Sequence, residues 1–165
     1  SVRIDLPGNG LLVSALEVDI TPAKKQDFYT TDHSLWLSKN STWKKTNVQK
    51  HIYEISTSGR LNEIKLLKIW RELNKLEFPS IYLEYLLIKN VLSNKPYGDD
   101  FLASNFYYIL QEFSKSVGNP LFSRIIDPAN SNNILSELLT NIEKNQIISK
   151  AQTATNQTSW DKIIW

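Results

Sequence analysis

The chain opens with apolar and polar residues in strict alternation, the pattern of a β-strand that buries one face. This alternation covers residues 2–6, and a dense turn signal, Pro-Gly-Asn-Gly, follows at residues 7–10. A second apolar run occupies residues 11–20. Together these features predict an N-terminal β-hairpin over residues 1–23. A lone hairpin is only marginally stable in water, so we expect it to pair with further strands or to pack against helices.

From about residue 41 the apolar positions recur at the spacing of an α-helix. The pattern predicts a mainly α fold, a helical bundle preceded by the hairpin, with residues 24–165 forming a helical lobe. Ser41 is a good N-cap residue and is expected to begin the first helix. The helix predicted over residues 59–75 is apolar on almost every side, which predicts a central, largely buried helix. Residues 22–40 are expected to form a long loop. The predicted helices cover approximately residues 41–56, 59–75, 79–92, 101–117, 134–153 and 159–165.

Composition excludes several classes of function. The 165 residues include no cysteine, which excludes a disulfide framework, a thiolate metal site and a cysteine nucleophile. Two histidines give little support to a zinc site. The formal net charge of +2 allows an anionic ligand, but no block of basic residues predicts a nucleic-acid partner. No apolar run approaches the ~18 residues of a membrane span, so we expect a cytoplasmic protein without a membrane partner.

The chain also contains no methionine, and it begins directly on a predicted strand. Both observations are expected of a processed chain or of a piece of a longer protein. A lost tag or a cleaved initiator methionine explains the missing methionine equally well.

Three groups of residues carry candidate chemistry, and the first lies on the second predicted strand. Glu17 and Asp19 are two residues apart and therefore share a face of that strand. Carboxylate oxygens on a rigid strand suit Mg²⁺, which typically binds one or two carboxylates together with substrate phosphates. The alternative is an ordinary polar face turned to solvent.

The other two groups lie on helices. Lys65, Lys68 and Arg71 follow one another at intervals of three residues, so they form a cationic row along one face of the second predicted helix. Such a row suits phosphates, although it is equally the pattern of long side chains that reach solvent and pair with nearby acids. Ser80 is expected in the first turn of the next helix, where backbone N–H groups favour an anion. A plain helix cap is the simpler interpretation of this serine.

The order of these groups resembles the cGAS/DncV-like nucleotidyltransferases (CD-NTases), bacterial relatives of cyclic GMP-AMP synthase and of the oligoadenylate synthases. Each motif alone is weak, but their shared order is moderately specific and covers essentially the whole chain. The segments that carry the resemblance are Val-Asp-Ile-Thr-Pro-Ala (18–23), Trp36, Ile-Lys-Leu-Leu-Lys-Ile-Trp (64–70), Ser-Ile-Tyr-Leu-Glu (80–84), Asp-Pro-Ala-Asn-Ser-Asn-Asn (127–133) and a closing tryptophan, Trp160 or Trp165.

The resemblance implies roles for individual residues. Asp19 matches the third metal-binding carboxylate of the catalytic triad, and it would also help to deprotonate the attacking hydroxyl. Lys68 matches the lysine that contacts the donor triphosphate, Ser80 matches the serine that assists it, and Lys65 is a weaker nucleotide-binding candidate. Ile81 stands where animal relatives often carry an aromatic residue, so base stacking is not expected there.

Two further residues that match the resemblance, Asp127 and Asn133, lie in a turn-rich segment. Aspartate and asparagine in such segments usually cap turns and helices. We therefore expect these two side chains to brace the helical core and not to touch substrate.

The chain departs from the family in one large respect. The Gly-Ser loop and the Asp-x-Asp pair that follows it are absent. The resemblance therefore implies the C-terminal portion of a nucleotidyltransferase fold, with the hairpin completing the catalytic sheet of a missing N-terminal part. The complete protein would use Mg²⁺ to join nucleoside triphosphates (ATP, GTP or others) into cyclic or linear oligonucleotide second messengers in antiphage signalling. This chain alone is expected to be inactive.

Two alternatives remain open at the level of sequence. An RNA-terminal nucleotidyltransferase has the same core, but it would need a strongly basic surface to bind RNA, and the net charge of +2 argues mildly against one. A non-catalytic helical binding module would share only the apolar helices. That module predicts that neither nucleotide nor Mg²⁺ changes the stability of the chain, whereas even a partial triphosphate site would raise it by mass action.

Overall fold

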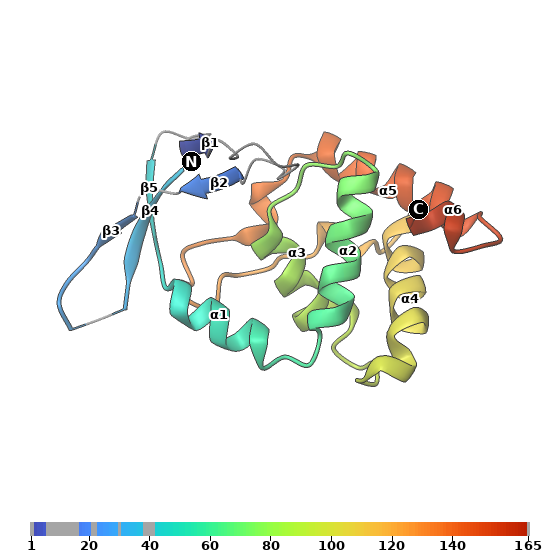
Figure 1. Ribbon diagram of the computed structural model, residues 1–165, viewed down its shortest axis with the longest axis horizontal. Helices are drawn as coiled ribbons and strands as arrows, with labels where there is room; N and C mark the ends of the chain where they lie inside the picture. The colour runs from blue at the N-terminus through green and yellow to red at the C-terminus, as the bar shows by residue number, and fades with distance from the viewer. Residues whose placement is uncertain (1, 6–16, 21–22, 30, 38–41, 165) are drawn as a thin grey trace, which may run out of the picture. The chain divides into compact units, whose positions relative to one another are not determined.

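The computed structural model describes residues 2–5, 17–20, 23–29, 31–37 and 42–164, with side chains described from residue 23 onward. Packing divides the chain into two compact units, residues 1–50 and 51–165. The strands belong to the first unit, and the second unit is helical (Figure 1). The mainly α fold class that the sequence predicts is therefore confirmed.

The N-terminal strand pair is present as predicted. Strand β1 (Val2–Asp5) pairs with β2 (Glu17–Ile20) in antiparallel orientation, and Val2 stands opposite Ile20. The predicted turn at residues 7–10 lies outside the described residues. The expectation that this pair completes a catalytic sheet stays a prediction.

A second sheet occupies the segment for which the sequence predicts a loop. Strands β3 (Ala23–Lys25), β4 (His33–Leu37) and β5 (Thr42–Thr46) form an antiparallel sheet in the order β3-β4-β5. The prediction of a loop over residues 22–40 is therefore wrong. So is a helix reaching back to residue 41, because Thr42–Thr46 is a strand and the first helix starts only at Val48. Trp36 and Trp43 are directly paired across β4 and β5, with ring centroids 5.4 Å apart, and such aromatic pairs stabilise a sheet.

The helices of the chain agree with the helical period of the sequence, usually with shorter bounds than predicted. The predicted helix over residues 134–153 begins later, at residue 141, after a short 3₁₀ turn. A capping box formed by Thr140 and Glu143 fixes that start. The helical elements are α1 (Val48–Ser56), α2 (Leu61–Leu73), α3 (Ser80–Leu86), the π-helix η2 (Leu87–Val91), the 3₁₀ turns η3 (Asp99–Phe101), η4 (Pro120–Phe122) and η5 (Leu135–Leu138), and α4 (Leu102–Ser114), α5 (Asn141–Thr155) and α6 (Asp161–Ile164).

The core of the helical unit lies between α2, α3 and α4. Trp70 of α2, Tyr85 of α3 and Phe106 of α4 are all fully buried. Helix α2 is less buried than its sequence predicts, because Ile69 and Leu73 are each about half exposed, at 48% and 50%. The helix therefore packs along one face only, and its opposite face carries apolar side chains at the surface.

A buried ion pair fixes the start of α2. Arg60 is 1% exposed and Glu63 is 3% exposed, and Nη1 of the arginine lies 3.2 Å from Oε1 of the glutamate. The same guanidinium donates to backbone carbonyls that follow the π-helix, those of Leu92 (2.7 Å), Lys95 and Pro96 (2.8 Å). Because one buried side chain satisfies several carbonyls about 30 residues away in sequence, Arg60 ties the start of α2 to the end of η2.

Candidate functional site

Two side-chain contacts join α2 to α3, one turn apart on each helix. Lys68 of α2 contacts Glu84 of α3, with 2.5 Å between Nζ and Oε1. Arg71 of α2 donates from Nη1 to Oγ of Ser80 at the start of α3, at 3.1 Å. The later residue of α2 meets the earlier residue of α3, so the two contacts form an antiparallel ladder between the helices. Lys68 and Ser80, which the sequence singles out separately, thus lie on adjacent rungs of one structure.

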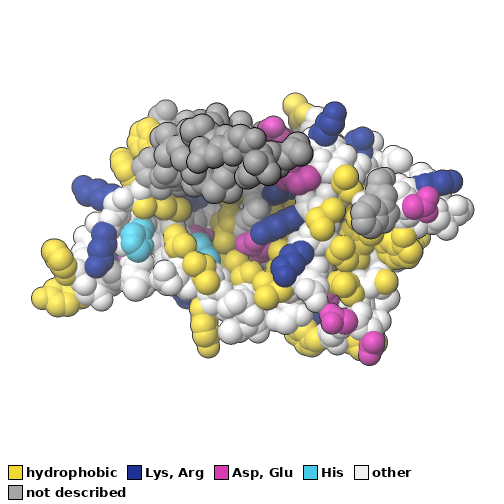
Figure 2. Space-filling model, in the orientation of Figure 1, with side chains coloured by type: hydrophobic (Ala, Val, Ile, Leu, Met, Phe, Trp, Pro, Cys, Tyr) yellow, Lys and Arg dark blue, Asp and Glu magenta, His cyan; other side chains and the backbone are white. Residues whose placement is uncertain are grey.

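Lys68 differs from its partner in exposure. The lysine side chain is 36% exposed, whereas that of Glu84 is 10% exposed. An ammonium group has three N–H donors, and the contact with Glu84 uses one of them. Lys68 can therefore bind an anion from solvent while it keeps its contact with the glutamate. Figure 2 shows basic and acidic side chains close together over α2 and α3.

Ser80 is held in a similar way. It is the first residue of α3, as the sequence predicts. Its hydroxyl oxygen accepts a hydrogen bond from Arg71, whose Nη1 also donates to the backbone carbonyl of Phe78 at 3.1 Å. Since an accepting hydroxyl still carries its own hydrogen, Ser80 can donate to a phosphate oxygen. Arg71 also contacts Glu72, so its guanidinium is engaged in the packing of the helix ends.

The remaining predicted site residues are less tightly placed. Lys65 is exposed on α2, one turn before Lys68. Asp19 lies on β2, opposite Arg3 in the strand register, and belongs to the first compact unit. The roles of Lys65, Lys68, Ser80 and Asp19 in binding or catalysis stay predictions. The sequence gives no role to Glu84, although it closes the Ser-Ile-Tyr-Leu-Glu motif.

A second polar cluster surrounds Asp127. Its Oδ1 lies 2.7 Å from Nε2 of His51 and accepts from the backbone N–H of Ala129, while Oδ2 accepts from Nδ2 of Asn133 at 3.0 Å. Burial raises the pKa of this carboxyl, but the hydrogen bonds from His51, Asn133 and Ala129 outweigh it and lower the pKa to about 2.

Asp127 and Asn133 are 3% and 6% exposed. Side chains so deeply buried and so fully bonded to their own chain brace the fold, as the sequence analysis expects. The cluster also connects α1, through His51, to the loop that contains Asp127.

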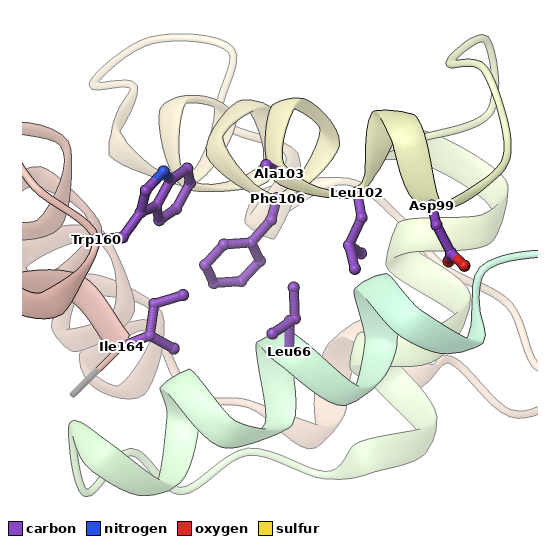
Figure 3. Close-up of a pocket in the computed structure, with 7 residues that line it drawn as sticks. All are labelled: Leu66, Asp99, Leu102, Ala103, Phe106, Trp160 and Ile164. Atoms are coloured by element: carbon purple, nitrogen blue, oxygen red, sulfur yellow. The ribbon is translucent and has the colours of Figure 1, made fainter.

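An apolar pocket of about 280 Å³ lies on another side of α2 (Figure 3). Leu66 of α2 points into it toward the ring of Phe106, and Trp160 and Ile164 close one end. Leu66 and Lys68 are two positions apart, and side chains so spaced on a helix point about 160° away from each other. The pocket is therefore separate from the ladder between α2 and α3.

Two structural findings bear on metal binding and membranes. Across the described ranges, no three histidine, cysteine, aspartate or glutamate side chains come together as potential metal ligands. None of the helices in the part of the chain that the structure describes has the length and apolar character needed to cross a membrane.

Comparisons with known proteins give structural relatives only. No family model matches the chain, and a search of curated proteins finds no significant match. Two solved structures of CdnC, a CD-NTase from E. coli MS115-1, are similar to it. The structure of CdnC with ATP has a TM-score of 0.64 at 21% identity and is matched over 88% of this chain and 54% of that chain. The complex of CdnC with HORMA-deltaN has a TM-score of 0.61 at 21% identity, over 89% of this chain and 53% of that chain.

The chain thus spans about half the length of the CdnC chains that it matches. At this level of identity the likeness establishes the fold. The expectation of a CD-NTase-like fold, which the order of the sequence motifs raised, is confirmed by these two structures.

Proposed function

We propose that this chain is the C-terminal part of a nucleotidyltransferase of the CD-NTase type, in which Lys68 and Ser80 hold the triphosphate of a nucleotide. The complete enzyme joins nucleoside triphosphates, such as ATP or GTP, into cyclic or linear oligonucleotide second messengers. We extend the proposal to a role in antiphage signalling in the cytoplasm, which rests on the resemblance alone.

One observation carries the binding part of the proposal. The partly exposed ammonium of Lys68 and the hydroxyl of Ser80 lie on adjacent rungs of the ladder between α2 and α3, and each has hydrogen-bond donors to spare. Phosphate recognition needs this combination of a cation and a neutral donor in fixed positions. The fold likeness to a CdnC structure with ATP supports the choice of a nucleotide as the ligand.

The proposed reaction of the complete enzyme also uses Mg²⁺. When bound, Mg²⁺ would neutralise charge on the reacting phosphates. Asp19 supplies one carboxylate, whereas Mg²⁺ requires near-octahedral coordination by oxygen. The side chain of Asp19 lies outside those that the structure describes, and the described side chains bring no three potential ligands together. We assign the remaining ligands to the nucleotide, to water and to carboxylates of the complete enzyme.

Calorimetric titration of the 165-residue chain with ATP tests the binding step. We expect weak but measurable binding, and we expect Lys68→Ala to weaken it by at least about tenfold, because a charge-assisted hydrogen bond contributes ~1.5–3 kcal/mol. Lys150→Ala removes an exposed lysine from α5 and serves as the matched control, with unchanged binding. In the complete enzyme, Lys68→Ala should raise KM or lower kcat for the nucleotide.

The alternatives give different results in the same titration. A non-catalytic binding module shows no heat with ATP, with or without Mg²⁺, and that result would overturn the proposal. An RNA-terminal enzyme binds a single-stranded RNA more tightly than ATP, with an affinity that falls steeply as salt rises. Wild-type affinity in Lys68→Ala would remove this lysine from the site.

A further inference from the structure

We propose that Glu84 is a positioning residue, which holds the Lys68 ammonium in place for the phosphates and remains bound to it in the complex. The inference rests on the proposed function and adds a role for a carboxylate that the sequence motifs leave unassigned. It is carried by the contact of 2.5 Å between Lys68 and Glu84 and by the unequal exposure of the two side chains.

Burial decides which partner is fixed. Glu84 is buried on a helix whose neighbouring residues Leu83 and Tyr85 are fully buried, so its carboxylate cannot turn to solvent without disturbing the core. Leaving a buried carboxylate unpaired is costly. An incoming phosphate is therefore expected to share the Lys68 ammonium with Glu84 instead of displacing it.

Positioning matters because a free lysine is highly mobile. Its four-carbon side chain loses much rotamer entropy when it is held in one place. In this chain the contact with Glu84 already restrains the Lys68 ammonium, so the rotamer entropy is lost on folding and not on ligand binding. Arg71 acts comparably on Ser80, whose hydroxyl oxygen it holds at 3.1 Å. Both proposed phosphate-binding side chains are thus ordered in advance by a partner on the neighbouring helix.

The direction in which Glu84→Gln changes phosphate affinity distinguishes a positioning role from a purely electrostatic one. Glu84→Gln removes a negative charge from the neighbourhood of an anion site. If Glu84 acts only as a charge, this variant binds phosphates more tightly than the wild type. If Glu84 positions Lys68, the variant binds more weakly, because the glutamine amide holds the ammonium less firmly than a carboxylate does.

The experiment titrates the 165-residue chain with inorganic tripolyphosphate and with ATP. We expect Glu84→Gln to weaken both by about three- to tenfold, the value of one immobilised long side chain. Glu77→Gln, which removes an exposed carboxylate before α3, is the matched control and should leave affinity unchanged or slightly higher. A melting temperature for Glu84→Gln within a few degrees of the wild type shows that the fold is retained.

A double-substitution cycle tests whether Glu84 acts through Lys68. In the Lys68→Ala background, Glu84→Gln should cause no further loss of affinity. Tighter binding by Glu84→Gln alone, or an equal loss with and without Lys68, would overturn the positioning role. If Lys68→Ala abolishes binding but Glu84→Gln leaves it unchanged, the positioning role is wrong and the proposed function is retained. No binding by the wild type would overturn both.

Discussion

Two ion pairs of similar chemistry lie along α2, one at its start and one near its middle, and they differ in how far solvent reaches them. Arg60 pairs with Glu63 at 2% and 3% side-chain exposure, whereas Lys68 pairs with Glu84 at 36% and 10%. The arginine gives its donors to the glutamate and to several backbone carbonyls, so few remain for a ligand. The lysine contacts one carboxylate and keeps donors toward solvent.

The difference shows how to distinguish structural cations from binding cations. A buried charge is tolerated only when its own chain satisfies it, and such a charge is then committed to the fold. A half-exposed charge held by a buried partner is ordered yet still accessible. By this criterion Arg60 stabilises the fold, whereas Lys68 keeps donors with which it can bind an anion, as we propose.

Removing the buried arginine is the strongest test of this distinction. Arg60→Ala leaves the Glu63 carboxylate buried and the carbonyls after η2 without their donor, so we expect a loss of about 3–5 kcal/mol in the free energy of unfolding. Urea denaturation followed by the helical circular dichroism signal measures this loss. Arg124→Ala, at an exposed position, is the control and should change stability by less than about 0.5 kcal/mol. A loss of less than about 1 kcal/mol in Arg60→Ala would show that this buried arginine does not hold the fold together.

Asp127 is a further buried charge that its own chain satisfies, and its effect on stability depends on pH. The pKa of Asp127 falls from 3.8 to about 2 on folding, and a lowered carboxyl pKa stabilises the fold at pH values above the unfolded pKa. The contribution of about 2 kcal/mol is therefore fully present above about pH 5 and is lost as the pH falls toward 2.

Urea denaturation of the wild type and of Asp127→Asn between pH 2 and 7 measures this contribution. The gap in stability between the two proteins should narrow as the pH falls. A gap that is constant over this range would show that the charge of Asp127 contributes nothing to the fold.

The smallest expected effect on stability belongs to the proposed binding residue. Lys68→Ala removes a partly exposed partner from Glu84 and opens the carboxylate to water, so we expect a cost of about 1–2 kcal/mol, less than for a fully buried pair. The same denaturation experiment should therefore rank Arg60→Ala well above Lys68→Ala, although Lys68→Ala is the variant expected to lose nucleotide affinity. Equal losses of stability in the two variants would mean that both ion pairs are structural.

The helices are predictable from the sequence because their apolar positions repeat at the helical period, whereas the strands of the second sheet have almost no repeating apolar pattern. Strand β3 is Ala-Lys-Lys with every side chain exposed, and β5 carries two lysines between its threonines. Such strands bury little apolar surface, so their pairing depends on partners distant in sequence, such as Trp36 opposite Trp43. No local pattern reports that pairing.

The candidate site shows the same limit. Lys68 and Ser80 were identified by the order of motifs, and their local helical positions agree with the structure. The contact between Lys68 and Glu84 joins residues 16 positions apart, and the contact between His51 and Asp127 joins residues 76 apart. Residue type and spacing cannot reveal which of several acidic residues meets a given cation after two helices pack together.

The π-helix at Leu87–Val91 makes the chain tolerant of a change in length at this point. Its wider turn accommodates one residue more than an α-helical turn would, and Leu87 and Val91 are buried in it. Deleting one residue of this turn is expected to convert it into an α-helical turn and to leave the direction of the chain beyond it unchanged. The carbonyls that Arg60 holds would then keep their places. The same deletion inside α2 would rotate everything beyond it by about 100°, so a loss of length is more readily accommodated in the π-turn than in its α-helical neighbours.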